Sequence, residues 1–156
     1  MAEHRSSHRR WWRRRRDWPL VTEAVCCLAV ARVMLRLQPF PRIARRLTRA
    51  ASPAQPVDAA LLANRVGWAV HAASRRLPWH PVCFDQAIAA QQMLRRRGLV
   101  AEIVYGVRHV AHGVDAHVWV RLEDGEIVVG GETSPLYQPI ALFRPGRDEV
   151  TLPTAQ

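Results

Sequence analysis

The hydrophobic period of the sequence changes at Gly98, and this change restricts the fold more than any other feature. Before Gly98, apolar residues recur every three to four positions, as on one face of an α-helix. After Gly98, apolar and polar residues alternate in segments rich in Val and Ile, which is typical of half-buried β-strands. Helices followed by an antiparallel meander of strands predict an α+β domain.

The part before Gly98 predicts four helices. Asp58 is placed to cap the third, whose buried face would include Leu61 and Val66. Gly98 is a suitable left-handed terminator for the fourth. The expected helices cover residues 18–37, 42–50, 59–77 and 84–97.

The part after Gly98 predicts a small antiparallel sheet. The sequence EDGE is a hairpin turn signal between the second and third strands, and residues 108–115 are expected to link the first two. The expected strands cover residues 100–107, 116–122 and 126–131, with a further short strand around 141–143.

A chain of 156 residues can form one domain with a hydrophobic core. We expect residues 17–156 to be that domain, with a helical part at 17–79 and a part that holds the chemistry at 80–145. Residues 1–16 are expected to be a flexible basic arm. Seven arginines against Glu3 give the arm +6 of the net charge of +10, which leaves +4 for the rest. The domain itself is therefore only mildly basic.

The sequence predicts a cytoplasmic protein. Its longest apolar run is interrupted by Glu23 and Arg32, so it is too short to span a membrane and does not resemble a secretory signal. Three cysteines, an odd number without framework spacing, indicate a reducing compartment.

Cys83 stands immediately before the fourth expected helix. Attack by cysteine needs a thiolate, and the free N–H groups and positive dipole at a helix start favour that anion. The same N–H groups could hold an oxyanion. Free cysteines are also common as buried residues, so position alone leaves both roles open. Cys26 and Cys27 lie inside an apolar helical run, where a buried structural role is expected.

His117 is the natural base for Cys83. It lies in the strand sequence AHVWVRL, where His117 and Trp119 face one way and Val118 the other. A buried structural histidine is the alternative, and the combination with Cys83 is more specific than either residue. Asp115 is expected to point to the face opposite His117.

A third group should orient the imidazole. With a two-residue turn at positions 124 and 125, Glu132 lies opposite His117 on the same face of the hairpin. A three-residue loop would instead place Gly131 there. Glu132 is therefore the candidate for the third catalytic group.

No metal ion or cofactor is expected. His109, His112 and His117 could surround a metal with Cys83, but their spacing matches no standard zinc pattern. The arm sequence RRWWRRRR combines charge with aromatic rings, which suits phosphate contact or an anionic membrane surface, and equally a solvated tail.

The sequence CFDQAIAAQQMLRRRGLVAEIVYGVRHVAHGVDAHVWVRLEDGEIVVGGE resembles the transglutaminase-like cysteine peptidases of lasso-peptide biosynthesis, which remove the leader from a precursor peptide. The shared pattern is a Cys-led helix, a strand, AHxWV, a Gly turn and a further strand, over about residues 80–132. The resemblance implies a transglutaminase/papain-like core and a Cys–His–Asp triad, of which Cys83 and His117 match. The third position differs from the family pattern, because VVGGE stands where an Asp is expected.

The resemblance implies a cysteine peptidase that acts with a separate small leader-recognition protein and a lasso cyclase. Membrane contact through the arm could accompany this activity, and a nucleic-acid partner is not expected. The alternative is a non-catalytic transglutaminase-like binding protein whose Arg/Trp arm contacts nucleic acid or a membrane surface. A third hypothesis for the function is acyl transfer to an amine instead of water.

Overall fold

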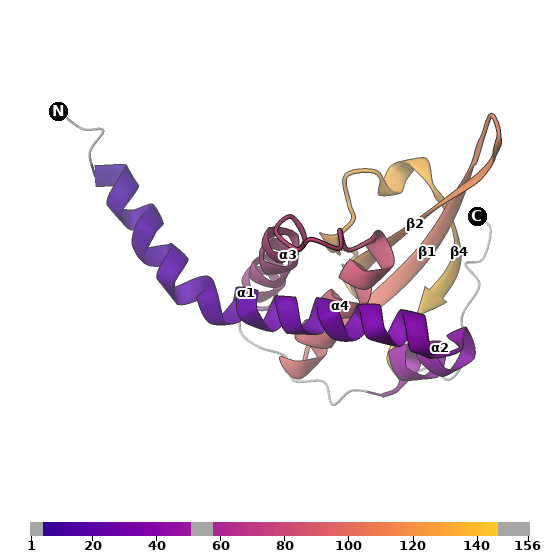
Figure 1. The fold of residues 1–156 in the computed structure, drawn as a ribbon, viewed down its shortest axis with the longest axis horizontal. Coiled ribbons are helices and arrows are strands. Elements are labelled where there is room, and N and C mark those ends of the chain that lie inside the picture. Colours follow the sequence, from indigo (N-terminus) through magenta and orange to yellow (C-terminus); the bar gives the residue numbers. More distant parts are fainter. Residues whose placement is uncertain (1–4, 51–57, 147–156) are drawn as a thin grey trace.

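The computed structural model describes residues 5–50 and 58–146, with side chains from Asp17 onward. Within these ranges, helices pack on an antiparallel sheet, which confirms the predicted α+β class (Figure 1). The elements are α1 (Arg5–Leu37), α2 (Phe40–Thr48), α3 (Ala59–Ser74), α4 (Cys83–Arg96), β1 (Ala101–Val110), β2 (Gly113–Leu122), β3 (Ile127–Val129), the 3₁₀ turn η1 (Ser134–Leu136) and β4 (Gln138–Phe143).

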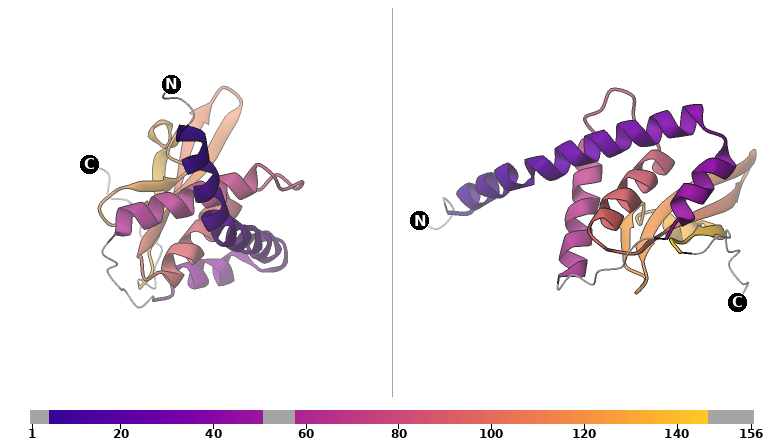
Figure 2. Two further views of the ribbon diagram at one scale, coloured as in Figure 1. Left: turned by 90° about the vertical axis from the view of Figure 1, so that its left-hand side faces the viewer. Right: turned by 90° about the horizontal axis from the view of Figure 1, so that it is seen from below.

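Helix α1 begins at Arg5, so residues 5–16 of the expected basic arm are helical and continuous with the helix that was expected to begin at residue 18. No Gly or Pro interrupts this stretch, and Arg and Trp are compatible with a helix. The N-terminal part of α1 extends beyond the rest of the fold, and the helix bends where it meets the domain (Figures 1 and 2). Pro19 lies inside α1, and an internal proline bends a helix because it lacks the N–H donor.

The sheet has the strand order β3-β2-β1-β4, and every neighbouring pair is antiparallel. Its helix-facing side shares one core with α1, α3 and α4, to which Ile103, Val120 and Phe143 contribute. The buried Gln91 side chain of α4 donates hydrogen bonds to the carbonyls of Ala101 and Phe143, and so joins α4 to β1 and β4. Leu61 was expected on the buried face of α3 but is exposed.

Strands β1 and β2 form a longer hairpin than predicted. Residues 108–110 and 113–115, expected to be a link, continue the ladder, and only Ala111 and His112 form the turn. His109 therefore lies in a strand. Alternation alone did not show this, because His, Ala and Gly are weak strand residues.

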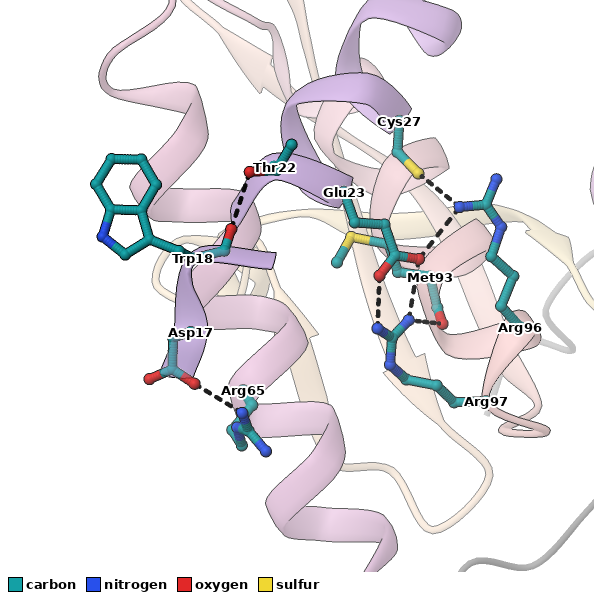
Figure 3. Close-up of polar contacts among 9 residues, drawn as sticks. All are labelled: Asp17, Trp18, Thr22, Glu23, Cys27, Arg65, Met93, Arg96 and Arg97. Atoms are coloured by element: carbon teal, nitrogen blue, oxygen red, sulfur yellow. Dashed lines mark hydrogen bonds and ion pairs between the residues drawn. The ribbon is translucent and has the colours of Figure 1, made fainter. Parts of the chain in front are cut away.

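Elements approach each other closely in two places. Helix α3 meets the sheet through a glycine, and helix α1 meets the end of α4 through charged side chains. Gly67 of α3 lies against β3, where an added Cβ would stand 2.3 Å from the Val128 carbonyl oxygen. Glu23 of α1 accepts hydrogen bonds from Arg96 and Arg97, which follow each other at the end of α4 (Figure 3). This cluster fixes α1 across the C-terminal end of α4.

Over the residues that the structure describes, no helix is both long enough and apolar enough to cross a bilayer.

The Glu23 cluster makes stability depend on pH. The Arg97 hydrogen bond holds the pKa of Glu23 below its usual value, with Arg96 acting in the same direction against burial. A lowered pKa in the folded state stabilises the fold above the unfolded pKa of about 4.3, and this contribution disappears as the pH falls through the folded value. Glu23→Gln should therefore lower the free energy of unfolding by about 1 kcal/mol at pH 7 and change it little near pH 3, measured by urea unfolding.

Glu132→Gln is the matched control, because Glu132 is exposed and has no ion pair among the described residues. An equal loss at both pH values would contradict the electrostatic role of Glu23.

Candidate active site

Cys83 is the first residue of α4, with Val82 at the N-cap position. The thiol is half-buried and packs against the edge of the core. The backbone N–H groups of Cys83 and Phe84 have no hydrogen-bond partner in the described part of the chain. The N-terminal end of a helix thus offers donors and a positive dipole at the thiol, as the sequence predicted.

A buried ion pair holds this helix start in place. Asp85, which is fully buried, accepts a hydrogen bond from the Val82 N–H at 3.0 Å and one from Arg32 of α1 at 3.2 Å. Its carboxylate satisfies one free donor at the start of the helix, and the Arg32 guanidinium offsets its buried negative charge. Asp85 Oδ1 and Arg32 Nε are buried without partners among the described residues, so a single hydrogen bond joins the two side chains.

His117 lies in β2 and is held by a backbone carbonyl. Its Nε2 is 2.9 Å from the Gly130 oxygen. A carbonyl oxygen can only accept, so Nε2 carries the proton in the neutral ring. Nδ1 is then the nitrogen that is free to accept a proton.

The imidazole also has two aromatic neighbours. Its centroid is 6.0 Å from Trp119, with the rings nearly parallel, and 5.1 Å from Tyr137. Trp119 is buried and covers Gly106, the residue paired with His117 on β1. A Cβ on Gly106 would come within 2.7 Å of the Trp119 ring, so a glycine is needed for this packing.

Tyr137 is anchored by charged groups on the same face of the sheet. Its hydroxyl donates to Asp115 Oδ2 at 2.8 Å, and Arg108 donates twice to the same oxygen. The Arg108 guanidinium also lies over the Tyr137 ring, 4.8 Å from its centroid. The prediction that Asp115 faces away from His117 was wrong, because residues two apart in a strand share a face.

The pKa of Tyr137 reflects these neighbours. The hydrogen bond to the Asp115 carboxylate raises the pKa of the phenol most, and burial raises it further. Arg108 and Tyr137 in turn lower the pKa of Asp115.

The two expected catalytic residues are nevertheless not hydrogen-bonded to each other among the described contacts. The His117 side chain lies on the face of β2 opposite to that of Val118 and Val120, which pack in the core with α4.

Glu132 is exposed and follows the end of β3. Val120 pairs with Val129 as the predicted register requires, but a bulge next to this pair and the early end of β3 interrupt the ladder. No hydrogen bond from Glu132 to His117 occurs in the described ranges, and the ring nitrogen that a carboxylate would hold is taken by Gly130. Asp124 is a turn residue, as expected, and accepts from the Glu126 N–H.

The remaining histidines and cysteines lie elsewhere. His109 and His112 are exposed near the tip of the β1–β2 hairpin, and the described residues contain no group of three or more His, Cys, Asp or Glu side chains that could hold a metal ion. Cys27 is buried as expected, and burial raises the pKa of its thiol. Cys26, for which a buried role was expected, is exposed.

Comparison with known proteins agrees with the fold and with the Cys-led helix. The family model described as the Transglutaminase-like superfamily matches residues 24–141. The chain therefore belongs to the transglutaminase-like superfamily. Searches of curated proteins and of solved structures gave no match.

Four groups of the site were not identified from the sequence: the Gly130 carbonyl, Tyr137, Arg108 and Asp85. The position of Asp115 two residues before His117 could have indicated the shared face. The Gly130 carbonyl has no signal in a sequence, because every residue has a carbonyl and the path of the chain after β3 places this one at His117.

The buried ion pair predicts a defined mutant phenotype. Asp85→Asn should lower the free energy of unfolding by about 1–3 kcal/mol, because it leaves Arg32 without its charge partner. The first turn of α4 should loosen, so alkylation of Cys83 by iodoacetamide should accelerate, as followed on the Cys83 peptide by mass spectrometry. Asp124→Asn is the control, since this exposed turn residue undergoes the same chemical change.

Proposed function

We propose that this protein is a cysteine peptidase that uses Cys83 as its nucleophile and His117 as its general base. The observation that carries the proposal is the position of Cys83 at the first residue of α4, with free N–H donors, in a chain of the transglutaminase-like superfamily. Nucleophilic attack on an amide needs a thiolate and an oxyanion site, and a helix start supplies both.

In the proposed reaction the Cys83 thiol gives its proton to Nδ1 of His117, and Sγ attacks the carbonyl carbon of the scissile amide. The N–H groups of Cys83 and Phe84 hold the oxyanion. The imidazolium then protonates the leaving amine, which departs and leaves a thioester. Water, deprotonated by His117, attacks the thioester, and the carboxylic acid and the free thiol are released.

The reaction requires the thiol and imidazole to come within hydrogen-bond distance when substrate is bound. Catalytic hydrogen bonds are often long in free enzymes and tighten in the complex. Gly130 supports the required tautomer, because its carbonyl keeps the proton on Nε2 and leaves Nδ1 as the acceptor. Tyr137 supports the position of the ring by direct contact.

We further propose, from the resemblance of residues 80–132, that the substrate is the precursor of a lasso peptide and that the enzyme removes its leader. In this proposal a separate small protein recognises the leader and a cyclase takes the released core peptide. No cofactor is required by the chemistry above.

The competing proposal is a transglutaminase-like binding protein without peptidase activity. It is favoured by two observations: the thiol and imidazole are not hydrogen-bonded among the described contacts, and the Arg-rich N-terminal part of α1 extends beyond the fold (Figure 1). In that case salt-sensitive binding to nucleic acid or anionic membranes should depend on residues 1–16 and not on Cys83.

The decisive variant is Cys83→Ala, assayed with the precursor peptide and the recognition protein by mass spectrometry of the products. Leader removal should fall by a factor of at least about 1,000, because the covalent step is lost. Cys26→Ala is the matched control, since it removes an exposed thiol and should keep full activity. Leader removal by Cys83→Ala at the wild-type rate would refute the peptidase proposal.

A second pair of variants separates the candidates for the orienting group. Glu132→Ala should retain activity, because the Gly130 carbonyl already holds the ring nitrogen. Tyr137→Leu should lower kcat by about tenfold or more through loss of the ring contact, while Tyr137→Phe keeps the contact and loses only the Asp115 hydrogen bond. If Glu132→Ala loses activity without unfolding, Glu132 is instead the group that orients the imidazole.

A further inference from the structure

The hairpin of β1 and β2 extends beyond β3, so part of β2 forms an edge of the sheet (Figure 1). Strand β1 pairs with β2 along its whole length, whereas β3 pairs with it at Val120 and Arg121. Among the described residues, the side of β2 that faces away from β1 is therefore unpaired from Gly113 to His117. We call this stretch the open edge.

The backbone groups of Val114 and Ala116 face outward at the open edge. Leu122 donates its N–H to the Glu126 carbonyl, so its backbone groups face β3 and not β1. Backbone groups two residues apart in a strand face the same way, and the ladder between β1 and β2 contains no bulge. The N–H and C=O groups of Val114 and Ala116 therefore point away from β1, and no backbone hydrogen bond in the described part of the chain engages them.

The open edge lacks the features that usually prevent a strand from adding to a sheet. Val114 is 62% exposed, and Ala116 is exposed as well. The charge of Asp115 between them is balanced by Arg108, which lowers the pKa of that carboxyl most, while the nearby Ala116 N–H contributes least. Strand β4, at the opposite edge, contains Pro139 and a register shift against β1, and both hinder pairing. The sheet is thus protected on the β4 side and open at the start of β2.

The open edge lies beside the candidate active site, because it ends at His117. Helix α4 agrees with this placement. Gln91 of α4 donates to the carbonyls of Ala101 and Phe143, where β1 begins and β4 ends. Cys83 lies about 12 Å earlier along the helix, at about 1.5 Å per residue, toward the end of the sheet where β2 begins (Figure 1). A peptide bound at the open edge therefore lies next to the imidazole.

An extended peptide fits such an edge, because its own backbone N–H and C=O groups continue the ladder. The outward groups of two residues suffice for a peptide but are a small contact for a second copy of the chain. We propose that the open edge binds an extended segment of the peptide substrate as an added strand, through main-chain hydrogen bonds to Val114 and Ala116. This inference rests on the proposed function, since it concerns the substrate of the same site. Main-chain pairing accepts many side chains and rejects a proline at a bonding position.

The test uses the full chain with Cys26→Ala, which leaves Cys83 as the accessible thiol because Cys27 is buried. The peptide acetyl-Thr-Val-Thr-Val-Cys-amide, activated as its 2-pyridyl disulfide, is joined to Cys83 by thiol–disulfide exchange. In this adduct the amides of Val114 and Ala116 should exchange hydrogen at least about tenfold more slowly than in the adduct of acetyl-Cys-amide, as measured by NMR.

The amides of Asp115 and His117 are the internal controls. They face β1 and already belong to the ladder, so their exchange should change by less than about twofold. The same peptide methylated on every threonine and valine nitrogen lacks the donors of a strand and should protect no amide of the open edge. Equal protection by the two peptides, or no protection of Val114 and Ala116 by either, would overturn the proposal.

Ala116→Pro and Ala116→Val form a matched pair of variants. Both substitutions enlarge the exposed side chain, but proline alone removes the N–H. That N–H faces away from β1, so neither variant breaks the ladder, and thermal unfolding checks this. Protection of Val114 should be lost in Ala116→Pro and kept in Ala116→Val, and an equal effect of the two would contradict pairing at this position.

Two further results are distinguished by the same measurement. Exchange of Val114 and Ala116 that slows with rising protein concentration, without any peptide, would assign the open edge to a second copy of the chain and refute the proposal. None of these adducts depends on catalysis, so a failure of the peptidase proposal, seen as unchanged leader removal by Cys83→Ala, is a separate result.

Discussion

The Arg32–Asp85 pair is the interaction on which the site depends most. A fully buried carboxylate in the first turn of α4 needs a charge partner to be stable there. Arg32 offsets this charge, and it can do so only because α1 lies across α4. The same carboxylate caps the helix whose free donors face the thiol. The N-terminal helix is therefore part of the candidate active site, although it contributes no reacting group.

The imidazole is held by neutral groups where the resemblance led us to expect a carboxylate. A carbonyl can fix the tautomer of His117 as a carboxylate does, but it carries no full charge to stabilise the imidazolium. The Asp115 carboxylate lies on the same face of the sheet as His117, but its Oδ2 oxygen is already shared by Arg108 and Tyr137. This arrangement favours positioning of the ring over electrostatic stabilisation of its protonated form.

The fold was largely predictable from the sequence, and the site only in part. The change of period at Gly98 was right and the start of α4 was right to within one residue, because periodicity and β-propensity act locally. Other helix ends differ: α3 ends at Ser74 and not at residue 77, and Asp58 at its N-cap makes no side-chain hydrogen bond. The third group was not predictable, since the chain leaves the ladder after Val129 with Gly130 in a left-handed conformation (φ 79°), and the Gly130 carbonyl then reaches His117. The role of Asp85 was not predicted either, because its burial depends on α1, which is distant in sequence.

The arginines show why net charge is a weak guide in this protein. A charge of +4 outside residues 1–16 suggests a diffuse, mildly basic surface. In the structure, Arg32, Arg97 and Arg108 are each engaged by a carboxylate that joins two elements or anchors a ring. The arginines of α2 have no such partner among the described ion pairs, and Arg46 borders a cavity. The position of the carboxylates, and not the total number of arginines, therefore determines which arginines hold the fold together.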